Sequence, residues 1–144
     1  MLQRPSIIAL LALLLSLPLS VQAASAQSFI VAHSATGSSP MSRGDIRRMY
    51  LNQKPKWPSG QRVRLAIMAH GPARDHLLQR YIGKNSARFD RYWKRQLFTG
   101  RGIPPETFTS QTEMLEYVRT TPGAIACYEG PTPPPALRII LVQD

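Results

Sequence analysis

Hydrophobic residues recur along this 144-residue chain with two periods, and each period predicts a different kind of element. Short runs of strand-forming residues predict buried strands at 28–33, 62–68, 124–128 and 137–142. Apolar residues three and four positions apart predict four helices between these strands. Their buried faces would consist of Ile46, Met49 and Tyr50; Ala73, Leu77, Leu78, Tyr81 and Ile82; Phe89, Tyr92, Trp93 and Leu97; and Met114, Leu115 and Val118. Strands that alternate with helices in this way predict an α/β fold.

Local signals mark the first helix and the segment that follows it. Ser42 and Asp45 have the spacing of a capping box, so a helix is expected to begin there. The sequence from Trp57 to Gly60 is typical of a turn that leads into the strand at 62–68. The stretch 50–60 also holds two lysines and a tryptophan, which could form a basic, aromatic patch for a ligand. A structural connector and a ligand patch are therefore both open at this point.

The first 26 residues have the pattern of a secretory signal peptide. Arg4 supplies a positive charge, residues 7–19 form a short apolar run, and small residues give candidate cleavage sites after Ala23 and Ala26. The run is shorter than the ~20 residues of a membrane-spanning helix, which favours a leader over an anchor. We expect residues 27–144 to form one domain. Because Cys127 is the only cysteine, no internal disulfide can form, and the bacterial periplasm is the expected location.

The charge balance is strongly basic. The chain has eighteen Lys and Arg side chains and eight Asp and Glu side chains, for a net charge of +10. Arg4 is the only basic residue before residue 27. Such an excess attracts anionic partners over long range. Phosphate, nucleic acid, lipopolysaccharide and a negatively charged protein surface are all candidates on this ground alone.

Two loops have the composition of an oxyanion site. Each follows a predicted strand and precedes a predicted helix, where ligands gather in open α/β sheets and where helix N-termini favour anions. Hydroxyls, backbone amides and one arginine could together hold an oxyanion. The alternative is that small hydroxyl residues simply form loops and caps. The predicted ligand-binding residues are Ser34, Thr36, Ser38, Ser39, Gly71 and Arg74, with His70 nearby.

Other chemistry finds little support in the sequence. The segment 89–102 interleaves aromatic and basic residues, as in proteins that bind single-stranded nucleic acid, but its helical spacing favours a core face with a solvated basic side. No dinucleotide or phosphate-loop fingerprint, zinc motif or nucleophile elbow is present. We therefore expect a protein that is not an enzyme, needs no cofactor or metal and binds no nucleic acid.

Several segments resemble phosphate-binding periplasmic proteins of ABC importers. The resemblance rests on FIVAHSATGSSPMSRGDIRRMYLNQKPKWPSGQRVRLAIMAHG at 29–71, LFTGRGIPPE at 97–106 and TPGAIACY at 121–128. It implies one lobe of a type 2 periplasmic-binding-protein-like fold, with a small central sheet and helices on both faces. It also implies that residues 54–60 are a connector. The family's Arg, Asp and Ser-Gly-Thr cluster is matched only by Gly71 and, at shifted positions, by Arg74 and Asp75.

The resemblance implies binding of phosphate or another small oxyanion in connection with ABC-type phosphate transport. An alternative stays open: an envelope interaction module that has lost its ligand and docks a protein or other anionic partner. Its contact residues would then include Arg88, Arg91, Lys94 and Arg95.

Overall fold

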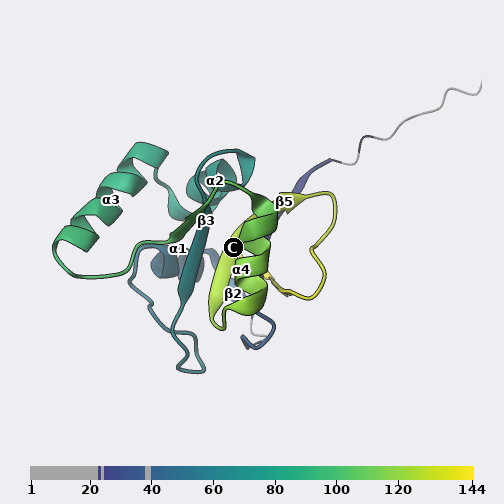
Figure 1. Cartoon of the computed structure of the whole chain (residues 1–144), viewed down its shortest axis with the longest axis horizontal. Helices are drawn as coiled ribbons and strands as arrows, with labels where there is room; N and C mark the ends of the chain where they lie inside the picture. Colours follow the sequence, from purple (N-terminus) through teal and green to yellow (C-terminus); the bar gives the residue numbers. More distant parts are fainter. Residues whose placement is uncertain (1–22, 24, 38–39) are drawn as a thin grey trace, which may run out of the picture.

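The computed structural model describes residues 23, 25–37 and 40–144, so nearly all of the predicted signal peptide lies outside the described residues. Figure 1 shows the helices and strands packed around one twisted sheet. In chain order the elements are β1 (Gln27–Ala32), β2 (Met41–Ser42), α1 (Arg43–Tyr50), β3 (Arg64–Met68), α2 (Pro72–His76), the π-helix η2 (Leu77–Ile82), α3 (Ser86–Phe98), β4 (Glu106–Phe108), α4 (Gln111–Thr120), β5 (Ala124–Gly130), β6 (Arg138–Ile140) and β7 (Val142–Gln143).

The main sheet mixes parallel and antiparallel pairs. Its strand order is β4-β3-β5-β1-β6, and β2 pairs with β7 separately. β3 runs parallel to both β4 and β5. β1 runs antiparallel to both β5 and β6. It follows that β1 and β3 point in opposite directions, which decides where their following loops lie.

The core lies on both faces of this sheet, so the predicted α/β arrangement with helices on both faces is confirmed. Alternate residues of each central strand enter opposite hydrophobic clusters, as in Ile125 and Cys127 against Ala124 and Ala126 of β5. α1, η2 and α3 contribute apolar side chains to one cluster. α4 covers the other face with Met114 and Val118, and it lies in front of the sheet in Figure 1.

The N-terminus of α1 has the capping box that the sequence predicts. Ser42 Oγ accepts a hydrogen bond from the Asp45 amide, and the Asp45 carboxylate accepts one from the Ser42 amide. The same carboxylate contacts Arg48 Nη2 at 2.6 Å and Lys54 Nζ at 3.0 Å. The Lys54 ammonium, with Arg48 and the two Ser42 donors, holds the pKa of Asp45 well below its usual value, although burial acts in the opposite direction. Asp45 thus ties the cap to the connector that follows the helix.

Trp57 fastens that connector to the sheet. Its side chain is buried in the core, and its Nε1 donates to the Gly123 carbonyl over 2.9 Å, just before β5. The Gly60 amide donates to the Trp57 carbonyl, and Lys56 forms an isolated β-bridge with Arg62. The segment 54–60 is therefore built as a structural corner.

The structure differs from the predicted elements in a few places. Leu97, predicted to face the core, is 60% exposed because α3 extends past the apolar surface that receives Phe89 and Trp93. The strand at 137–142 is split at Leu141 into β6 and β7. β4 was not predicted. Within the part of the chain that the structure describes, no helix has the length and apolarity to cross a membrane.

Asp45→Asn tests the cap. We expect the free energy of unfolding at pH 7 to fall by about 1–2 kcal/mol, because the cap and its two cationic contacts are weakened. The folded-state pKa of Asp45 is lowered, so its contribution is complete above the ordinary value of 3.8 and is lost as pH falls below that value. In urea unfolding, the difference in the free energy of unfolding between the unmodified protein and Asp45→Asn should therefore become smaller from pH 7 to pH 3. A difference that stays the same at both pH values would contradict the stabilising role given to ionised Asp45.

Candidate anion-binding site

The two predicted ligand loops leave the sheet at opposite ends. Ile125 of β5 pairs with Ala32 of β1 and also with Leu65 of β3. β1 and β3 run in opposite directions past Ile125. β1 ends at Ala32, and the first loop leaves the sheet beside Ala124. β3 continues from Leu65 for three residues in the opposite direction, to Met68. At about 3.3 Å per residue, the two strand ends lie roughly 10 Å apart along the strands before the loops diverge further. Among the predicted residues that the structure describes, Ser34 and Thr36 are therefore not brought together with Gly71 and Arg74.

The first loop is closed by its own hydrogen bonds. Thr36 is buried, and both its amide and its hydroxyl donate to the His33 carbonyl, at 3.0 and 2.6 Å. Ser34 is exposed, and its carbonyl accepts from Arg138 Nη2 over 3.4 Å. Ser38 and Ser39 lie outside the described residues. The Thr36 hydroxyl acts here as a turn-forming group, which is the alternative that the composition left open.

The second loop presents a helix N-terminus. Gly71 caps α2 with φ 96° and ψ −179°, a conformation that is essentially restricted to glycine, and none of the described side chains caps the helix. Pro72 at the first helical position has no amide hydrogen, and the helical path continues through η2 to Ile82. The amides of Ala73 and Arg74 are therefore among the first donors of this helical run and need partners from outside it.

A hollow of about 380 Å³ lies beside this N-terminus. Gln111 forms part of its wall, and the side-chain amide of Gln111 exchanges two hydrogen bonds with the backbone of Glu129, at 2.9 and 3.0 Å. The Glu129 carboxylate accepts from Ser28 Oγ at 3.5 Å. Along β5 the Glu129 side chain falls on the face of Ile125 and Cys127, opposite to the face of Met68 and Ala73, so the part of Glu129 that Gln111 holds beside the hollow is its backbone. The hollow is lined by Ala26, Met68, His70, Gly71, Pro72, Ala73, Gln111 and Glu129.

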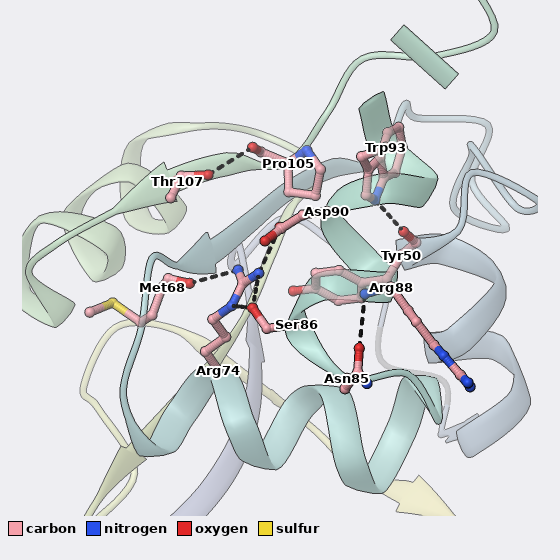
Figure 2. Close-up of polar contacts among 10 residues, drawn as sticks. All are labelled: Tyr50, Met68, Arg74, Asn85, Ser86, Arg88, Asp90, Trp93, Pro105 and Thr107. Atoms are coloured by element: carbon pink, nitrogen blue, oxygen red, sulfur yellow. Dashed lines mark hydrogen bonds and ion pairs between the residues drawn. The ribbon is translucent and has the colours of Figure 1, made fainter. Parts of the chain in front are cut away.

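Arg74, the predicted cationic ligand residue, is turned into the protein instead. Its side chain is only 6% exposed, and Figure 2 shows its guanidinium among protein acceptors. Nη1 donates to the Met68 carbonyl at 3.1 Å, Nε and Nη2 donate to Ser86 Oγ at 3.1 and 2.9 Å, and Nη2 contacts the Asp90 carboxylate at 2.8 Å. The guanidinium carbon also lies 5.6 Å from the centre of the Phe89 ring. Arg74 thus joins α2 to the end of β3 and to α3.

Sequence reasoning missed the partners of this arginine and the far wall of the hollow. Ser86 and Asp90 are four residues apart on one helix face, a spacing that could have suggested a shared partner. Gln111 and Glu129 come from distant elements, and no local signal connects them. Their proximity follows only from the packing of α4 on β5.

The remaining reactive groups are built into the core. Burial, with a smaller effect from Glu129, raises the pKa of the Cys127 thiol to about 12, so the thiol stays neutral at pH 7. Burial also raises the pKa of Tyr50, whose hydroxyl donates toward the Ala66 and Ile125 carbonyls. Among the described residues, no group of three or more His, Cys, Asp or Glu side chains is placed to share a metal ion.

Arg74→Ala should act on stability first. We expect the free energy of unfolding to fall by about 2 kcal/mol, because the Met68 carbonyl and the half-exposed Asp90 lose a charged donor. Arg88→Ala, at an exposed position of α3, is the control and should change stability by less than about 0.5 kcal/mol. Urea unfolding measures both. Equal stability of the two variants would contradict the structural role given to Arg74.

Comparison with known proteins relates the chain to others through its fold. No protein-family model matches the sequence, and no curated protein matches it. Solved structures with a similar fold include the following two. One is assigned as a phosphate ABC transporter substrate-binding protein from Clostridium perfringens, with bound phosphate (TM-score 0.64, 10% identity, 81% of this chain and 45% of that chain). The other is an ABC-type phosphate transport receptor from Vibrio cholerae (TM-score 0.53, 12% identity, 81% and 46%).

This chain spans less than half the length of each solved protein. At such low identity the likeness concerns the fold alone. What is established is a mixed α/β fold of the kind found in these phosphate ABC transporter substrate-binding proteins.

Proposed function

We propose that this chain is a periplasmic, non-enzymatic solute-binding-like protein that binds phosphate or another small oxyanion at the N-terminus of α2. Residues 1–26 would be its signal peptide and residues 27–144 its single lobe. The observation that carries the proposal is the hollow beside Gly71, where a helical run begins without a side-chain cap. The solved structures with a similar fold are phosphate-transport proteins, which makes phosphate the first ligand to test and ABC-type transport its context.

The contacts in this proposal come from one loop. The Ala73 and Arg74 amides would donate to the anion, helped by the positive end of the helix dipole, and exposed His70 would lie at the rim. The Arg74 side chain would position the loop through its contact with the Met68 carbonyl. Ser34, Thr36, Ser38 and Ser39 belong to the first loop and are not part of this narrowed site.

Affinity at such a site should be modest. An anion in an open hollow remains in contact with water, where each charged contact is weaker. We therefore expect binding in the millimolar to micromolar range, roughly −4 to −8 kcal/mol.

The basic face of α3 supports a second candidate function. Its side chains are exposed, as a docking module for a protein or other anionic envelope partner would require. This candidate needs no ligand at Gly71, so the two functions are separable by mutation. The exposed basic residues of this face are Arg88, Arg91, Lys94 and Arg95.

Phosphate should stabilise the folded protein. A ligand that binds only the folded state at ~100 times its Kd raises the free energy of unfolding by about 2.7 kcal/mol. Thermal unfolding with phosphate, sulfate and chloride at matched ionic strength measures this effect. A phosphate response no larger than that of chloride would rule the site out.

Gly71→Ala should remove the phosphate effect. An L-residue is strained at this backbone conformation, at a cost on the order of 1–2 kcal/mol, and relief of that strain reshapes the loop. Gly60→Ala is a matched control, since Gly60 has φ +88° and open space around it but lies in the turn after Trp57. Both variants should lose stability, and only Gly60→Ala should keep the phosphate shift. Loss of the shift in both, or in neither, would contradict the placement of the site.

A further inference from the structure

Two large apolar side chains are exposed at the C-terminal end of α3, and a third is exposed in the loop that follows it. Phe98 is 93% exposed, Leu97 60% and Ile103 62%, and we call these three residues the apolar tip. Figure 1 shows α3 at one margin of the molecule. Exposed apolar clusters on a folded protein commonly mark surfaces that contact another body.

The apolar tip is held in place. Gly100, with φ 66°, ends the helix in the left-handed conformation, and the Arg101 amide donates back to the Gln96 carbonyl at 2.9 Å. Asn52 Nδ2 donates to the Arg101 carbonyl at 2.6 Å, which ties the following loop to the body. From α3, Trp93 Nε1 donates to the carbonyl of Tyr50 in α1 at 3.1 Å. These contacts hold Phe98 outward on a supported helix end.

Positive charges predominate around Leu97 and Phe98 in the sequence, and the acidic residue nearest to Ile103 is Glu106. Residues 91–105 contain four basic side chains and no acidic one. Within the part of the chain that the structure describes, none of these four cations takes part in an ion pair. Their charge is therefore available to an external anion. The four are Arg91, Lys94, Arg95 and Arg101.

We propose that the apolar tip and these four cations dock the protein on an anionic phospholipid surface. A bilayer interface offers apolar depth and negative headgroups side by side, which matches Phe98 flanked by arginine and lysine. A second copy of the chain fits poorly, since it would bring two strongly basic helix ends together. This proposal is independent of the anion site at Gly71 and uses a different surface of the chain.

Vesicle binding tests the proposal directly. The protein is produced from Gln27, the first residue of β1, so that the apolar run at 7–19 does not itself bind lipid. It is sedimented with vesicles of phosphatidylcholine alone and with an equal mixture of phosphatidylcholine and phosphatidylglycerol. We expect binding only to the mixed vesicles and a loss of that binding at high salt.

Two variants and two matched controls define the surface. Phe98→Ser should weaken binding at least about tenfold through lost apolar burial, whereas Leu141→Ser, at a residue 72% exposed between β6 and β7, should not. The double reversal K94E/R95E should weaken binding more than about tenfold, at roughly fivefold for each lost cation. The control with equal charge change, R80E/R119E on η2 and α4, should change it less than about threefold.

Three results would overturn the proposal. One is no binding of the unmodified protein to the mixed vesicles, which would leave an acidic protein as the partner to seek. The second is equal binding to both vesicle types. The third is binding that Phe98→Ser and Leu141→Ser weaken equally, which would leave the apolar tip without a part in it. None of these results would bear on the phosphate response, because the Gly71 loop is unchanged in every variant.

Discussion

The arrangement of this end of the protein depends on the contacts of one buried group, the guanidinium of Arg74. A guanidinium away from water must find acceptors for its donors, and here the acceptors come from the end of β3 and from two residues of α3. Satisfying one side chain therefore holds together three elements that are separate in the sequence.

Both proposed surfaces extend from this unit. On one side, the Met68 carbonyl and α2 set the position of the Gly71 loop against the wall formed by Gln111 and Glu129. On the other side, the contacts of the guanidinium with Ser86 and Asp90 hold the N-terminal end of α3, and the C-terminal end of this helix carries Leu97 and Phe98 of the apolar tip. A small chain can in this way carry two kinds of contact on one scaffold, a helix N-terminus for an anion and a helix C-terminus for a larger surface.

Local features of the fold were predictable from the sequence because their causes are local. The Ser42–Asp45 cap and the buried stripe of α2 and η2 depend on neighbours a few residues away, and both are present. Periodicity shows which side of a helix is apolar but not how far the core extends beneath it, and Leu97 lies beyond that limit. β4 is only three residues long, follows two prolines and becomes a strand through pairing with β3.

The anion site was harder to predict because it depends on strand direction. The sequence shows that both candidate loops follow strands, but antiparallel pairing of β1 with β5 separates them. The burial of Arg74 has a similar cause, since its partners lie up to 16 residues away and meet it only after α3 folds back. Trp57 was ambiguous between ligand patch and corner for the same reason, because its partner Gly123 is distant in the chain.

The most direct test of the central claim is a phosphate titration followed residue by residue through backbone amide NMR signals. If the anion binds at the start of α2, the largest shifts should fall on the amides of Gly71, Ala73 and Arg74, with little change at Ser34 and Thr36. Saturable shifts centred on the first loop, or on the basic face of α3, would contradict the account.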